Sequence, residues 1–150
     1  GARYFASPRL RHSSPSGRYL RKERDMAKGK PHLEFFPLDM DDGWETPEGY
    51  PDGITQKVLV TDLDEDGKSG SRSRFLRFVP GEYTTVPFVH DHWEEVFLVE
   101  GDLIVGNDEN GEGGEKFTAP TFACRPPGAA HGPFKSDGGC LLFELHYYQD

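Results

Sequence analysis

Hydrophobic and polar residues alternate over short stretches along most of the chain after about residue 50. These stretches are rich in Val, Leu, Phe, Thr and Tyr, which favour strands, and none keeps a helical period over a dozen residues. The segments between them, such as DLDEDGKSG and NDENGEGG, have the Gly, Asp and Asn typical of turns. The pattern predicts strands at 54–61, 73–80, 95–106, 116–126 and 140–148. Their even spacing indicates an all-β fold, a single antiparallel barrel or sandwich.

The sequence divides into a basic arm, residues 1–30, and one domain, residues 31–150. A chain of 150 residues fits one domain that buries roughly two-thirds of its extended-chain surface. The arm has nine Lys or Arg against two acidic residues and is rich in Ser. Three interpretations stay open for it: a transit-like peptide, an RNA-binding arm, or sequence upstream of a start at Met26. We expect it to be disordered or loosely docked, and dispensable for the fold.

Charge, hydropathy and cysteine content exclude several kinds of partner and site. Residues 31–150 have eight basic and 24 acidic residues, and such an acidic domain argues against nucleic acid as a partner. No apolar run approaches the ~18 residues of a membrane span, so we expect a soluble, cytoplasmic protein with no membrane partner. Cys124 and Cys140 form no C-x-x-C pair, which argues against a thiolate zinc site.

The densest candidate chemistry lies in FVHDHWEEVFLVEGDLIVG, residues 88–106. Side chains of a strand alternate between its two faces, so His90, His92 and Glu94 point the same way if this segment is extended. Two imidazoles and a carboxylate on one face are ligands that a first-row divalent metal accepts. A fourth candidate ligand is His131, which follows a Pro-Pro-Gly turn and would face the others across a closed barrel.

Two motifs at these positions resemble those of the cupins. Residues 80–101, PGEYTTVPFVHDHWEEVFLVEG, resemble the first cupin motif, with Glu94 placed seven residues before a glycine. Residues 125–134, RPPGAAHGPF, resemble the second motif, Pro-x-Gly-x-x-His, which ends at His131. Residues 138–148 resemble the closing strand of the cupin domain in ChrR-type anti-sigma factors. The resemblance implies a small single-domain cupin, an antiparallel double-stranded β-barrel or jelly roll.

The first motif fits the sequence in two registers. The cupin pattern has three residues between the second histidine of its His-x-His pair and the glutamate. Counting back from Glu94, that second histidine is His90, Phe88 replaces the first, and His92 is an extra residue in the turn. In the other register His90 and His92 are the pair, with Glu94 or Glu95 as the carboxylate. Strand parity favours a metal site that His92 also reaches.

The resemblance implies a mononuclear metal centre with His90, His92, Glu94 and His131 as its ligands. Imidazole and carboxylate ligands suit Fe, Mn, Ni, Cu or Zn. Fe is favoured because small single-domain cupins include oxygenases. Such an enzyme would act on a small dicarbonyl or a phenolic ketone that chelates the metal. The catalytic candidates among the other residues are Glu95 and, in the closing strand, His146.

Two alternative functions stay open. The resemblance to ChrR-type domains implies a non-catalytic module that senses a metal or ligand. A metal-dependent isomerase or lyase would need a free carboxylate near the metal, which Glu95 or Glu144 would supply if it faces inward. In each case we expect a small-molecule ligand, and the sheet edges favour a homodimer.

Overall fold

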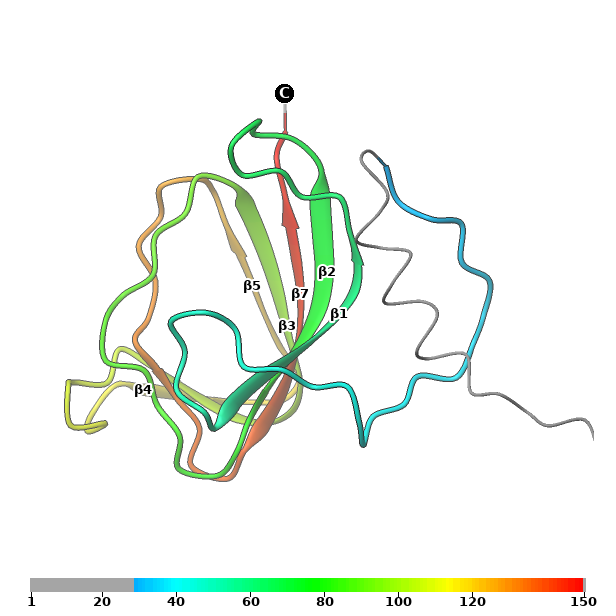
Figure 1. Cartoon of the computed structure of the whole chain (residues 1–150). Helices are drawn as coiled ribbons and strands as arrows, with labels where there is room; N and C mark the ends of the chain where they lie inside the picture. Colours follow the sequence, from blue (N-terminus) through cyan, green and yellow to red (C-terminus); the bar gives the residue numbers. More distant parts are fainter. Residues whose placement is uncertain (1–28, 150) are drawn as a thin grey trace, which may run out of the picture.

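The computed structural model describes residues 29–149, which form seven antiparallel strands and no helix (Figure 1). The strands are β1 (Ile54–Thr61), β2 (Ser71–Phe78), β3 (Trp93–Val105), β4 (Glu115–Thr118), β5 (Thr121–Arg125), β6 (Phe134–Lys135) and β7 (Cys140–Tyr147). The predicted all-β antiparallel class is therefore confirmed. The predicted basic arm, residues 1–30, lies outside the described residues except for its last two. Within residues 29–149 there is no helix long and apolar enough to cross a membrane.

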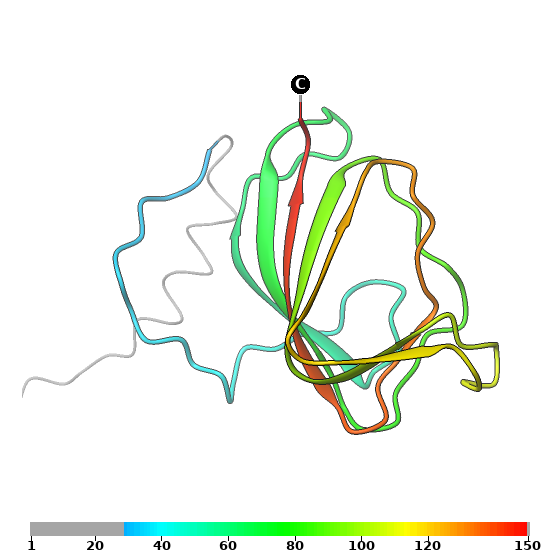
Figure 2. The same cartoon turned by 180° about the vertical axis from the view of Figure 1, so that it is seen from behind.

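Strand β3 connects the two parts of the barrel. Its first part pairs with β7 on one side and β5 on the other, and its last residues pair with β4 and β6. The strand bends at Gly101, which has a φ of 84° and lies so close to Gly139 that an added Cβ would be 2.0 Å from the carbonyl oxygen. Strands β1, β2, β7, β3 and β5 form one curved wall, and β4 turns away from it at the bend (Figures 1 and 2).

The inward positions of β2, β7 and β3 lie opposite one another in rows. β2 and β7 pair without a shift, and the register of β3 with β7 shifts between Leu98 and Glu100. Two rows at one end of the strands are apolar, and their members other than the exposed Gly101 belong to the buried core, which also includes Ile54. Two rows at the other end are largely polar. The apolar rows are Leu76–Leu142–Leu98 and Phe78–Cys140–Gly101, and the polar rows are Arg72–His146–Glu94 and Arg74–Glu144–Val96. The same strands therefore supply both the core and a polar interior.

The observed strands agree with the predicted ones to within a few residues. The stretch 54–61 matches β1, and the predicted strands at 73–80, 95–106 and 140–148 correspond to β2, β3 and β7. The stretch 116–126 divides into β4 and β5 at Ala119 and Pro120, because proline has no N–H to donate to a ladder. The two-residue strand β6 was not predicted, since its surroundings are dominated by Pro and Gly.

Candidate metal centre

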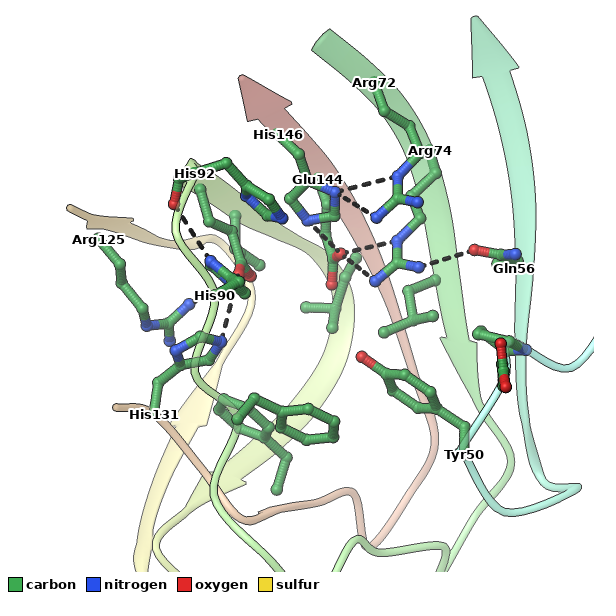
Figure 3. Close-up of a pocket in the computed structure, with 18 of the residues that line it drawn as sticks. Tyr50, Gln56, Arg72, Arg74, His90, His92, Arg125, His131, Glu144 and His146 are labelled. Carbon is green, nitrogen blue, oxygen red and sulfur yellow. Dashed lines mark hydrogen bonds and ion pairs between the residues drawn. The ribbon is translucent and has the colours of Figure 1, made fainter. Parts of the chain in front are cut away.

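Two loops far apart in sequence meet along the open side of the curved wall. The backbones of Phe88 and His131 exchange both hydrogen bonds of an isolated bridge, 2.8 and 3.0 Å long. A third backbone bond, 2.8 Å long, runs from the Gly128 N–H to the His90 carbonyl. These bonds hold the histidine of the second motif beside those of the first (Figure 3).

Three side chains converge on one point in this region. The Nε2 atoms of His90 and His131 lie 2.5 and 3.2 Å from the same carboxylate oxygen, Oε2 of Glu94. The donor atoms of all three residues lie within 4.8 Å of one another. Glu94 is buried at the start of β3, and the ring of His131 is only 7% exposed. Two imidazoles and one carboxylate thus surround a single small volume.

The hydrogen bonds of the two histidines fit a cation at this point. Nδ1 of His90 donates to the His92 carbonyl at 3.1 Å, and Nδ1 of His131 donates to the Ala129 carbonyl at 2.9 Å. Nε2 of each ring also faces a carboxylate oxygen, which can only accept. A neutral imidazole has a single N–H, so it can donate from Nδ1 or from Nε2 but not from both. With Nδ1 as the donor to the backbone, the contact between Nε2 and the carboxylate requires either a second proton on the ring or a metal ion bound by Nε2. An Nδ1–H donated to a backbone carbonyl is the usual arrangement of metal-binding histidines.

The surroundings of Glu94 favour its ionised form. Burial alone would raise the pKa of Glu94, but hydrogen bonds from His131 and His90 outweigh it and hold the pKa well below its usual range. Burial alone would lower the pKa of His90, and the hydrogen bond and charge of Glu94 outweigh it and raise the pKa. The guanidinium of Arg125 lies 3.4 Å from Oε1 of Glu94. Glu94 is therefore a negatively charged ligand candidate at neutral pH.

The three residues line a cavity of about 440 Å³ inside the barrel (Figure 3). One side of it is aromatic, because the ring of Phe88 stacks on Tyr50 at 5.1 Å and lies 6.2 Å from Phe134. The inward polar residues of β2 and β7 also line it, and Arg74 lies over the Tyr50 ring, 6.0 Å from its centre. A cavity of this size accommodates a small organic molecule beside the donor atoms.

Solved structures of known proteins share this architecture. An RmlC-like cupin from Shewanella frigidimarina NCIMB 400 is 20% identical, with 78% of this chain and 93% of that chain covered and a TM-score of 0.55. An acetylacetone dioxygenase from Acinetobacter johnsonii is 23% identical, with 82% and 83% covered and a TM-score of 0.56. The chain has the cupin fold. A polyketide cyclase from Streptomyces resistomycificus is 18% identical over 78% and 81%, with a TM-score of 0.56. Neither a protein-family model nor a curated protein sequence matches the chain.

The three residues whose donor atoms come together, His90, Glu94 and His131, are common to both registers of the first motif. His92 is not among the residues whose donor atoms lie within 4.8 Å of one another. Its ring stacks on that of His90 at 4.0 Å, and its Nε2 lies 3.8 Å from Glu65. The parity argument required an extended segment, whereas β3 begins only at residue 93 and the two residues before it form a bend.

A second polar cluster lies beside the donor atoms in the interior of the cupin barrel. Oε2 of Glu144 accepts from Nε and Nη2 of Arg74, at 2.9 and 2.8 Å, and lies 3.2 Å from Nε2 of His146. Nδ1 of His146 in turn accepts from Arg72 at 3.1 and 2.9 Å. Because Nδ1 is the acceptor, the proton of the neutral ring is on Nε2, so His146 lacks the tautomer that a metal would need at that atom.

The catalytic candidate Glu95 and the aromatic residues Trp93 and Tyr148 lie away from the cavity or at its edge. Glu95 does not line the cavity, since it alternates with the inward Glu94 on β3. Trp93 stacks on Tyr147 at 6.3 Å with nearly parallel rings. The Tyr148 hydroxyl donates to Asp91 at 2.8 Å. Of the two catalytic candidates, only His146 faces the interior.

Sequence reasoning missed the arginines of β2, although a signal for them was present. In SRSRFLRF, Arg72 and Arg74 have the same parity as Leu76 and Phe78, which are buried. The alternation therefore continues from the apolar core into the polar interior. Tyr50 was also missed, and it lies in a segment without strand pattern.

Proposed function

We propose that the protein binds one divalent metal ion through His90, Glu94 and His131. The observation that carries this proposal is the convergence of both Nε2 atoms on Oε2 of Glu94, with each Nδ1 bonded to a backbone carbonyl. A divalent cation bound by the Nε2 atoms of His90 and His131 has the same charge as the two protons that these atoms would otherwise carry. The donors include no thiolate and suit Fe, Mn, Ni, Cu or Zn, of which we favour Fe.

The function that this arrangement supports best is a mononuclear non-heme oxygenase. Two histidines and one carboxylate that leave coordination positions open are typical of iron(II) oxygenases. Phe88, at the fourth corner, offers no donor atom, so positions remain for a substrate. A metal bound here would act as a Lewis acid for substrate oxygens and as a relay of electrons to O₂. The acetylacetone dioxygenase among the similar structures supports a small dicarbonyl as substrate, and a phenolic ketone is the alternative.

The residues of the chain would bind and orient such a substrate. The stacked rings of Tyr50 and Phe88 provide a flat apolar surface for a planar enolate. Glu94, Glu144 and His146 are buried, and an enolate held beside them would interact more strongly with cationic groups than it does in bulk water. All three donors to Glu144 use Oε2, so Oε1 is the oxygen that would accept a proton from the substrate carbon.

Glu144 also supports a second candidate function, a metal-dependent isomerase or lyase. Its carboxylate is buried, and a donor atom lies within 4.8 Å of one in Glu94. Enolisation by this carboxylate would be common to both functions, and only the oxygenase would consume O₂.

The test is reconstitution of chelator-treated protein with Fe(II), followed by O₂ uptake with acetylacetone. We expect one metal ion per chain and O₂ consumption that depends on both metal and substrate. A His131→Ala variant, which has lost one ligand, should lose both properties, while Asp91→Ala outside the cavity should keep them. Metal binding without O₂ uptake, combined with exchange of the substrate C–H for deuterium, would instead favour the redox-neutral function. A protein that binds no metal would refute both.

A further inference from the structure

Two arginines extend from β2 into the cavity, and they differ in what neutralises them (Figure 3). Arg74 forms an ion pair with Glu144 and donates to Gln56 at 2.7 Å. Arg72 instead donates to Nδ1 of His146, through Nε and Nη2. Among residues 29–149, no carboxylate lies within ion-pair distance of Arg72.

The partner of Arg72 carries no negative charge. Because Nδ1 of His146 accepts these hydrogen bonds, the ring is neutral and its Nε2–H points to Glu144. The acidic residue with the largest electrostatic effect on Arg72 is Glu144, which is already paired with Arg74, and Glu65 follows with a side chain that is 64% exposed to water. Arg72 is thus a cation at the cavity wall that forms no ion pair of its own among residues 29–149, because the nearby carboxylate of Glu144 is already paired with Arg74.

The pKa values of the two guanidinium groups agree with this difference. For Arg74, burial alone would lower the pKa, and the charge of Glu144 outweighs it and raises the pKa. For Arg72, burial dominates and lowers the pKa. A buried charge without a partner is costly, so an anion that entered the cavity would gain free energy at Arg72.

The third arginine of the cavity does not have this property. The Arg125 guanidinium lies 3.4 Å from Glu94 and over the ring of Phe134, 5.6 Å from its centre. It already faces a carboxylate and an aromatic surface.

We propose that Arg72 binds a carboxylate of the substrate, so that the substrate is a small oxo acid. Its oxo oxygens would face His90, Glu94 and His131, while its carboxylate would accept hydrogen bonds from the free N–H groups of Arg72. Arg72 and Glu94 belong to one row across β2, β7 and β3, two strand spacings or about 10 Å apart at the backbone. This inference rests on the proposed function for the position of the oxo group, but the carboxylate site itself depends only on Arg72.

The experiment compares succinylacetone, a dicarbonyl with a terminal carboxylate, with its uncharged methyl ester. Binding of both is measured by calorimetry to metal-free protein and to zinc-loaded protein, in which no turnover occurs. We expect the acid to bind about ten- to a hundredfold more tightly than the ester, the ratio that charge-assisted hydrogen bonds supply. In Arg72→Gln this ratio should fall to about one.

Two further variants separate recognition from folding. Arg77→Gln removes a cation from the outward face of the same strand, where Arg77 lies over Trp44 at 3.9 Å, and should keep the full ratio. Arg72→Lys keeps the positive charge and should keep part of the acid-to-ester affinity ratio. Thermal unfolding of each variant shows whether it is folded.

Each possible outcome decides the proposal. Equal affinity for acid and ester in the unmodified protein, no measurable binding of the acid, or a ratio unchanged in Arg72→Gln would overturn it. A protein that fails to bind zinc but keeps an acid preference that depends on Arg72 would support the carboxylate site and overturn only the proposed function. A protein that binds zinc but shows no preference for the acid would overturn the carboxylate site and leave the proposed function in place.

Discussion

Replacing Arg74 by Met should destabilise the protein through Glu144 rather than through lost packing. The two side chains are 7% and 6% exposed and are joined by contacts of 2.8 and 2.9 Å. Met keeps most of the aliphatic stem and removes the charge, which leaves the buried carboxylate without its counter-charge. Removal of one partner of a buried ion pair costs about 3–5 kcal/mol. Because His146 still donates to Glu144, we expect about 3 kcal/mol, or roughly 10 °C in Tm.

The loss should depend on pH in a defined direction. In the folded protein burial would raise the pKa of Glu144, but the charge of Arg74 and the His146 hydrogen bond outweigh it and lower the pKa. A lowered pKa contributes stability above the unfolded value of about 4.3, and this contribution is lost as the pH falls. In Arg74→Met burial dominates and raises the pKa, so the carboxyl group becomes neutral at higher pH. The difference between the two proteins should therefore be largest near neutral pH and shrink toward pH of about 4.

The assay is urea unfolding of chelator-treated proteins over this pH range. The double variant Arg74→Met/Glu144→Gln should recover most of the loss, because it removes the uncompensated charge as well. Arg77→Met, on the outward face of β2, should cost about 1 kcal/mol or less. A single variant as stable as the unmodified protein at neutral pH, or a double variant no more stable than the single one, would refute this reasoning.

Three further outcomes are expected. His90→Ala should lose nearly all bound metal while His92→Ala keeps most of it, as measured by elemental analysis of proteins purified in parallel; equal loss would return His92 to the ligands. Iodoacetamide at pH 8 should modify the exposed Cys124 before the buried Cys140, whose pKa burial raises to about 11, as peptide mass spectrometry would show. Gly101→Ala should lower the Tm by roughly 10 °C or more, because its φ of 84° and the nearby Gly139 carbonyl leave no room for a Cβ; an unchanged Tm would contradict the role given to the bend.

The sequence was sufficient for the fold because its strand pattern and its turn residues agree. β1 was predicted at its observed bounds, and the turn glycines lie where the chain reverses. Glu94 was placed correctly on the inward face because it lies within β3, where strand parity holds. His131 was brought to the same site by two cupin motifs, which encode a meeting of loops that local pattern alone does not contain.

The remaining parts of the site depend on geometry that parity does not determine. His92 lies in a bend just before β3, so the alternation that orients Glu94 does not orient its ring. Arg72 and Arg74 had the parity of buried residues, but charge made them resemble a solvent-exposed face. The register of β2 with β7 places Arg74 opposite Glu144 and Arg72 opposite His146, so only Arg74 is paired with a carboxylate. The sequence alone does not give this register.

The division of β2, β7 and β3 into apolar and polar rows has a consequence for dynamics. One end of these strands is fixed by packed side chains such as Leu76, Leu98 and Leu142, of which Leu76 and Leu142 also form part of the wall of a cavity of about 440 Å³, and the polar end surrounds the rest of that cavity. The free energy needed to open backbone hydrogen bonds follows the apolar contacts around them, so amide protons near the cavity mouth should exchange with solvent through local opening. Those of the apolar end should exchange only when the whole domain unfolds. Small molecules can then enter and leave the barrel while its closed end keeps the strands in register.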